Sequence, residues 1–170
     1  MVSKKDQDKI KRLFEEADKK FKYGDFTGAI INLDEIISID PENSKAWNNR
    51  GTFKNDLGQH KEAIKDLNEA IRLKPDFSIA YAERGSAKIC MNQQEEAIKD
   101  LDQAIRLKSD DAVAWNKRGI TKGKLKQHEE SIEDFDEAIS LNPKNEPAII
   151  SRVAARAEMN ANKVLEERLG

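Results

Sequence analysis

Cysteine, net charge of either sign and long hydrophobic runs are all scarce in this chain. Cys90 is the only cysteine, which excludes an internal disulfide framework and makes a reducing, cytoplasmic location the expectation. No apolar run approaches the roughly 18 residues that a membrane span needs, and no secretory signal is visible after Met1. The 30 basic and 32 acidic side chains nearly balance, so the basic excess typical of nucleic-acid binders is missing. We therefore expect neither a membrane nor a nucleic acid among its partners.

An internal repeat of 34 residues organises the sequence. Charged residues make up 36% of the 170 residues, and this length suits one domain or one continuous array. Residues 62–74 and 96–108 are close copies of each other. Fixed self-similarity of this length indicates stacked units, none of which buries its apolar face alone. The residues that recur at this spacing are aromatic residues, glycines and prolines: Trp47, Tyr81 and Trp115; Gly51, Gly85 and Gly119; Pro41, Pro75 and Pro143.

The second half of each unit carries the pattern of an amphipathic helix. Its apolar residues step along one helical face. In three units this helix is predicted to end two residues before the proline, at Ile39, Leu73 and Leu141. In the unit that ends at Leu73, the apolar residues are Ala63, Ile64, Leu67, Ala70 and Ile71.

The first half of each unit predicts another helix, with an aromatic residue and a glycine four residues later, as at Trp47 and Gly51. A glycine inside a helix costs about 1 kcal/mol relative to alanine, so its recurrence indicates close contact between helices. A turn is expected between the two helices, at Gly58, Asn92 and Lys126. Each unit is therefore predicted to be helix–turn–helix, and no strand is predicted.

These residues resemble the tetratricopeptide repeat, from Trp47 and Gly51 through Gly58 to Pro75. The resemblance implies an all-α fold, a right-handed α-solenoid of antiparallel helix pairs, formed as a single array over residues 1–170. The expected repeats are residues 10–43, 44–77, 78–111 and 112–145, followed by a partial or capping repeat over 146–170, which stops before its second helix is complete.

Catalytic chemistry finds little support in the sequence. His60 and His128 lie two repeats apart, at the start of the second helix of their units, which indicates a packing role at the turn. Cys90 has no histidine at a comparable depth in its unit, which favours a free thiol over a nucleophile. No phosphate-binding glycine loop or metal-ligand motif occurs. We expect no enzyme activity, no cofactor and no metal.

A column of arginines admits two interpretations. Arg50, Arg84, Arg118 and Arg152 recur at the 34-residue spacing and could form a basic groove, or each could pair with a carboxylate within the fold. Sixteen residues after the first three come aspartates, and in the first unit both the arginine and the aspartate are replaced. This covariation favours structural ion pairs. The predicted partners are Asp66, Asp100 and Asp134, and the replacements in the first unit are Glu16 and Asn32.

The resemblance also implies where a partner binds, because the first helices of tetratricopeptide units line a concave groove. Asparagines on this face fit two hypotheses: solvated filler, or amides that hold a partner's backbone by both donating and accepting hydrogen bonds. Aliphatic residues on the same face favour a partner segment, extended or helical, with aliphatic side chains. The candidate groove residues are Lys45, Asn48, Asn49, Thr52, Ile79, Glu83, Ser86, Val113, Asn116, Lys117 and Ile120.

One branch of the family, the co-chaperones, grips the C-terminal carboxylates of heat-shock chaperones with lysine, asparagine and arginine side chains. In the first three units the corresponding places hold Phe14 and Asp18, then Asn49, then Ile79 and Glu83. Only Asn49 matches. We therefore predict that this carboxylate clamp is absent.

The leading hypothesis is a non-enzymatic scaffold that binds a peptide or helix of a partner protein in its groove. The alternative is a self-assembly module, or part of a longer array, that associates through its last helix, residues 148–159. That helix is expected to leave an apolar strip of Ile149, Ile150 and Val153 and to favour a weak homodimer. RNA binding is a third hypothesis, disfavoured by the acidic pI.

Overall fold

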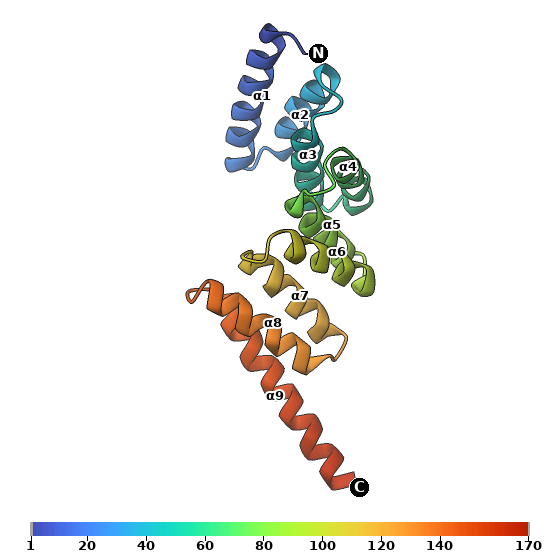
Figure 1. Ribbon diagram of the computed structural model, residues 1–170, viewed down its shortest axis with the longest axis vertical. Helices are drawn as coiled ribbons and strands as arrows, with labels where there is room; N and C mark the ends of the chain where they lie inside the picture. Colours follow the sequence, from blue (N-terminus) through green and yellow to red (C-terminus); the bar gives the residue numbers. More distant parts are fainter. Residues whose placement is uncertain (1, 170) are drawn as a thin grey trace. The chain divides into compact units, whose positions relative to one another are not determined.

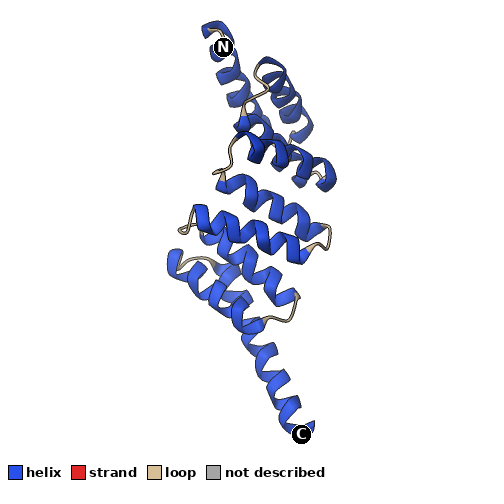
Figure 2. Ribbon diagram, turned by 45° about the vertical axis from the view of Figure 1, so that its right-hand side comes forward, coloured by secondary structure: helices blue, strands red, loops and turns tan. Residues whose placement is uncertain are grey.

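The computed structural model describes residues 2–169, of which Glu166, Arg168 and Leu169 are described by their backbone alone. This part of the chain forms helices joined by short loops and contains no strand (Figure 2), so the predicted all-α architecture of paired helices is confirmed. The helices are α1 (Lys4–Lys22), α2 (Phe26–Ile39), α3 (Ser44–Asp56), α4 (His60–Leu73), α5 (Ser78–Cys90), α6 (Gln94–Leu107), α7 (Ala112–Lys124), α8 (His128–Leu141) and α9 (Glu146–Leu169).

The chain divides into two compact units, Met1–Met91 and Asn92–Gly170. The first unit holds α1 to α5 and the second holds α6 to α9 (Figure 1). The single array over residues 1–170 stays a prediction. Within the described residues, no helix is both long enough and apolar enough to cross a membrane. The cytoplasmic location also stays a prediction.

In the first unit, α1 packs on α2, α3 on α4, and α5 on α4 and α3. The core between the first two pairs includes Leu33 and Ile36 of α2, which have no exposed surface. Ala63, Leu67 and Ala70 of α4 form a second cluster. These three residues belong to the apolar stripe predicted from the sequence, and all are fully buried. Burial of this stripe is the main source of stability that such short helices have.

In the second unit, α7 packs on α8 and α6, and α9 packs on α8. Phe135 and Ala138 of α8 form the core with Ala148 and Ala155 of α9. Met159, just past the middle of α9, also packs against this core. The end of α9 extends beyond α7 and α8 in Figure 1.

Left-handed residues make the turns inside the helix pairs. Gly58, Asn92 and Lys126 have φ values of 75°, 57° and 61°, at the turn positions predicted from the sequence, and Gly24 has the same conformation in the first pair. Helices α2, α4 and α8 end at Ile39, Leu73 and Leu141, as predicted. The 34-residue period therefore specifies both the turns and the helix ends.

The recurring glycine permits close approach of the two helices in a pair. A Cβ atom on Gly51 would lie 2.7 Å from Cγ of Leu67, and a Cβ atom on Gly119 would lie 2.8 Å from the ring of Phe135. Both distances are too short for real contacts. The predicted role of these glycines, helix contact rather than a turn, is confirmed for both positions.

The last helix differs from the prediction. The sequence suggested a helix that ends near Met159, but α9 runs without interruption from Glu146 to Leu169. Asn160 holds the place of the left-handed turn residues, yet it lies within the helix. The residues after it include Glu166 where α4 has Ile64. A second helix built from them would bury little apolar surface, whereas continuing α9 adds a backbone hydrogen bond per residue.

Candidate functional site

A groove of about 650 Å³ lies in the first unit, between α1, α3 and α5. Six of the eleven predicted groove residues lie along it: Lys45, Asn48, Asn49, Thr52, Ile79 and Glu83. The structure thus brings these six together. The other residues along the groove are Asp18, Phe21, Ser44, Phe53, Lys74 and Phe77.

Asn48 is the most deeply placed polar residue of the groove. The residue is only 5% exposed. Its Nδ2 donates to Oδ1 of Asn49 at 3.3 Å, and its backbone carbonyl accepts from the Thr52 hydroxyl at 3.1 Å. Its Oδ1 has no hydrogen-bond partner in the part of the chain that the structure describes. Because a buried polar atom without a partner costs about 1–3 kcal/mol, a rotation of this amide that let Oδ1 accept a hydrogen bond would be favourable.

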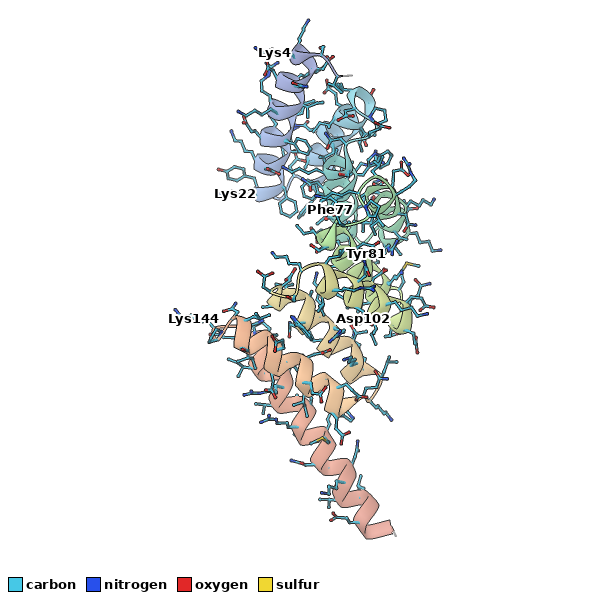
Figure 3. The ribbon with its side chains drawn as sticks, in the orientation of Figure 1. Lys4, Lys22, Phe77, Tyr81, Asp102 and Lys144 are labelled. Atoms are coloured by element: carbon cyan, nitrogen blue, oxygen red, sulfur yellow. The ribbon has the colours of Figure 1, made fainter. Side chains whose placement is uncertain are left out.

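Aromatic side chains supply the apolar surface of the groove. The rings of Phe21 and Phe53 stack at a centroid distance of 4.4 Å and an interplanar angle of 13°. Phe77 precedes α5, close to α3 in the side-chain view (Figure 3). Ile79 on the first turn of α5 is about half exposed. A groove with aromatic and aliphatic walls and a few amides between them suits the side chains and backbone of a peptide.

Charged side chains of both signs lie along the groove. Lys45 and Lys74 each place Nζ over an aromatic ring, Lys45 at 4.6 Å from the Phe14 centroid and Lys74 at 5.1 Å from the Phe77 centroid. The ammonium groups therefore have an attractive partner within the chain. Asp18 on α1 and Glu83 on α5 contribute the negative charges.

The other five predicted residues lie outside this groove. Ser86 donates its hydroxyl to the carbonyl of Ala82, one turn back in its own helix, at 2.9 Å. The remaining four belong to the second unit. Val113 is exposed, Asn116 and Lys117 are partly buried, and Ile120 lies along a smaller cavity of about 270 Å³ next to α8 and α9. Asn116, which has the repeat position of Asn48, also has an Oδ1 without a partner among the described residues.

The arginine column forms ion pairs within the units. Arg50 donates from Nε and Nη2 to both oxygens of Asp66 at 2.8 and 2.7 Å. Arg118 binds Asp134 in the same way at 2.9 and 2.6 Å. These two predicted pairs are confirmed, and neither arginine lies along the groove. The predicted pair of Arg84 and Asp100 joins residues of different units and stays a prediction.

The carboxylates hold these arginines in the charged form. Burial lowers the pKa of Arg50, but its hydrogen bonds and the charges of Asp66 and Asp34 outweigh burial and raise the pKa above its ordinary value. The pKa of Arg118 is raised in the same way, with burial opposed by Asp134 and Asp102. Each guanidinium group also lies 4.6 Å from the centroid of a tryptophan ring, Trp47 or Trp115.

A second set of partners escaped the sequence analysis. In all four arginines of the column, Nη1 donates to a residue sixteen positions earlier, in the preceding repeat. The contacts are Arg50 to Asp34 at 2.6 Å, Arg84 to Asn68 at 2.7 Å, Arg118 to Asp102 at 2.7 Å and Arg152 to Asp136 at 2.6 Å. Asp102 is labelled on α6 in Figure 3. The sequence carried the signal, because these partners recur every 34 residues.

The residues considered for catalysis are not assembled into a site. His60 Nδ1 lies 2.6 Å from Oδ1 of Asn55, and His128 Nδ1 lies 3.7 Å from a carboxylate oxygen of Glu158. Cys90 is a free, exposed cysteine. Among the described residues, no group of three histidine, cysteine, aspartate or glutamate side chains is placed to hold a metal ion.

Comparisons with known proteins agree with this architecture. Family models described as tetratricopeptide repeat match residues 44–77, 79–111 and 112–145. No curated protein sequence matches the chain at a significant level.

Several solved structures of other proteins share this fold. A crystal structure of MamA protein is 28% identical, with a TM-score of 0.78 over 91% of this chain and 84% of that one. The first such repeat domain of Spaghetti (RPAP3), bound to the HSP90 peptide SRMEEVD, is 29% identical, with a TM-score of 0.67 over 69% and 94%.

An O-GlcNAc transferase mutant of Thermobaculum terrenum is 21% identical, with a TM-score of 0.76 over 82% of this chain but only 27% of that one, which shows the fold alone. The fold is typical of non-enzymatic scaffolds, but it also forms part of an enzyme, so the expected lack of activity stays a prediction. The family models and the paired-helix structure lead to one conclusion: the chain belongs to the tetratricopeptide repeat family.

Proposed function

We propose that this protein is an interaction module that binds an extended or helical segment of a partner protein in the groove of its first unit. The observation that carries the proposal is Asn48, a buried amide whose Oδ1 lacks a partner among the described residues and which lies along an aromatic-walled groove. A rotation of the Asn48 side chain toward the groove would let Oδ1 accept that hydrogen bond from a backbone N–H of the bound segment. The similar repeat domain of Spaghetti (RPAP3) binds a peptide of HSP90, which supports peptide binding as the function.

The chemistry of the partner differs from that of an acidic tail. Asp18, Asn49, Ile79 and Glu83 hold four of the places that form a carboxylate clamp in co-chaperones, and all four lie along the groove. Two of them are acidic here and would repel a carboxylate. We therefore propose a partner segment with a lysine or arginine near aliphatic side chains, in which the cation lies by Asp18 and Glu83. Micromolar affinity, about −8 kcal/mol, is reasonable for one short segment.

Selection from a random peptide library on the immobilised chain tests this function. Asn49→Ala and Asn116→Ala, separately and together, should not lower the melting temperature much, since neither side chain belongs to the helix–helix core. We expect Asn49→Ala to weaken binding of the selected peptides about tenfold, the loss of one or two hydrogen bonds. Asn116→Ala tests whether the second unit also contributes to binding of the selected peptides.

Lys65→Ala is the matched control, because Lys65 is exposed on α4 of the same unit and away from the groove. Its binding should equal that of the wild type. Peptides that bind the Asn49→Ala variant normally, but lose binding when α4 or α9 is altered, would show that the groove is not the site.

A further inference from the structure

Arg152 has the same repeat position as Arg50 and Arg118 but lacks one of their two carboxylates. Nε and Nη2 of those two arginines bind an aspartate in the following helix. Arg152 makes the contact with the preceding repeat, from Nη1 to Oδ1 of Asp136 at 2.6 Å. Its Nε is shielded from solvent and has no hydrogen-bond partner within the described part of the chain.

In the other two units this carboxylate lies on the second helix of the pair. Among the described residues, α9 is followed by no such second helix. Sixteen residues after Arg152 the sequence has Arg168, where the other two units have Asp66 and Asp134. The Arg152 side chain is 27% exposed, against 14% for each of its two equivalents. The greater exposure leaves the guanidinium group of Arg152 more open to an incoming carboxylate than those of Arg50 and Arg118.

The surface of α9 beside Arg152 also favours an acidic helix. On α7 the equivalent surface is covered by α8, with Phe135 packed over Gly119. On α9 the place of Gly119 is taken by Val153, which is 60% exposed. Arg156, also exposed, shares Asp136 with Arg152, so two guanidinium groups face one carboxylate. The α9 face, defined as Ile149, Arg152, Val153 and Arg156, thus combines apolar area with excess positive charge.

We propose that the α9 face docks an amphipathic helix of a partner protein that carries an aspartate or glutamate opposite Arg152. The partner helix packs on α9 as α8 packs on α7, and its carboxylate binds the exposed edge of the Arg152 guanidinium group. This site is separate from the groove of the first unit and does not depend on the function proposed for it.

Val153 adds a second requirement: the partner helix needs a small residue next to its carboxylate. In the chain's own second helices, the residue after the aspartate is Leu67 in α4 and Phe135 in α8. At the spacing of these two pairs, a Cβ atom at the glycine position would lie 2.7 Å from Leu67 or 2.8 Å from Phe135. The first pair accommodates the single methyl group of Ala17 opposite Leu33, but the branched side chain of Val153 needs more room, so Val153 disfavours both large residues. The partner helix therefore has alanine, serine or glycine there. This size limit also argues against a second copy of the chain, whose α4 and α8 carry a large residue at that place.

Disulfide tethering measures this docking without a known partner. The protein carries Cys90→Ser and Asn160→Cys, since Asn160 has the repeat position of the α7–α8 turn, where a docked helix begins. The probe is a synthetic peptide of residues 60–73 of this chain with an added N-terminal cysteine and Leu67→Ala. At a fixed concentration of reductant, the fraction of mixed disulfide reports non-covalent affinity, because the tether raises the effective concentration.

Peptide controls separate the charge from the size requirement. We expect the Leu67→Ala peptide to form the mixed disulfide about fivefold more than its Asp66→Asn version, and more than the peptide that keeps Leu67. On protein with Val153→Gly, the peptide that keeps Leu67 should become the better probe. On protein with Arg152→Gln, the difference between the peptide that keeps Asp66 and its Asp66→Asn version should vanish.

Equal mixed-disulfide fractions for all peptides would overturn the proposal. So would sedimentation that reveals a dimer of the chain that Val153→Glu abolishes, because a second copy would then cover the α9 face. A concentration-independent monomer with the expected peptide ranking supports the proposal.

Discussion

Asn32 donates from Nδ2 to a carboxylate oxygen of Glu16 at 3.2 Å, in the positions where Asp66 and Arg50 form an ion pair in the next repeat. The hydrogen-bonded contact is kept while the ion pair is lost, because the acidic Glu16 replaces the arginine and the neutral amide of Asn32 replaces the aspartate. Lys20 donates to Oδ1 of Asn32 at 2.9 Å, just as Lys54 donates to Asp66 at 2.7 Å. The same place between the two helices of a pair can therefore be occupied either by an ion pair or by a hydrogen bond between a carboxylate and an amide.

Asp66→Ala should be strongly destabilising. Asp66 is buried and receives hydrogen bonds from Arg50 and Lys54, so its removal leaves two partly buried cations without that partner. We expect a loss of about 3–5 kcal/mol in the free energy of unfolding, measured by urea denaturation. Asp76→Ala, at an exposed loop residue, is the control and should change stability by less than about 0.5 kcal/mol. Equal effects of the two substitutions would contradict the structural role of the pair.

Two glycines on α7 should respond to alanine in opposite directions. Gly119→Ala places a methyl group 2.8 Å from the Phe135 ring, and we expect a loss of about 1–3 kcal/mol from overpacking. Gly123→Ala meets only the Ser131 hydroxyl at 3.3 Å, so the gain in helix propensity of up to about 1 kcal/mol should outweigh this contact and raise the stability. Thermal unfolding of both variants tests the difference. A Gly119→Ala protein as stable as the wild type would show that α7 and α8 can separate without cost.

Lys126→Gly should stabilise the protein. Lys126 has a φ of 61° in the turn between α7 and α8, a conformation that costs a residue with a Cβ atom about 1–2 kcal/mol. Because glycine also adds entropy to the unfolded chain, we expect a net gain of up to about 1 kcal/mol. Lys99→Gly, inside α6 and exposed, is the matched comparison and should cost about 1 kcal/mol. A fall in melting temperature for both would contradict the turn assignment.

Removing the acidic groups of the groove should change which peptides bind. Asp18→Asn together with Glu83→Gln keeps the shape of the groove but removes two negative charges. We expect library selection on this variant to lose the enrichment of lysine and arginine found with the wild type, and the remaining binding to depend less on salt. Glu95→Gln, exposed on α6, serves as the charge control. Unchanged peptide preference in the double variant would contradict the proposed charge recognition.

Most of the fold could be predicted because residues at equivalent positions recur in several repeats, and each recurrence indicates the same local structure. Gly58, Asn92 and Lys126 share no side-chain chemistry, yet their common spacing identified the turns. The pairing of Arg50 with Asp66 followed from covariation within the chain.

The reach of α9 could not be predicted in the same way. A partial repeat has no second copy of its pattern to compare, and whether Asn160 turns or continues the helix depends on the apolar surface that follows it. The site was predictable only in part for a related reason. The resemblance to tetratricopeptide repeats placed Asn48 and Ile79 on the groove side, but Phe21, Phe77 and Lys74 depend on how neighbouring pairs pack, which no single helix pattern contains.

The backward reach of the arginines has a consequence for how the repeats unfold. Each of these side chains couples its repeat to the preceding one, so neighbouring repeats share part of their free energy and should unfold together rather than one by one. The coupling is unequal, because Arg84 meets the neutral amide of Asn68, whereas Arg50 and Arg118 meet carboxylates. Added salt should therefore weaken the contact between Arg50 and Asp34, which couples the first repeat to the second. The contact between Arg84 and Asn68, which couples the second repeat to the third, should stay nearly unchanged.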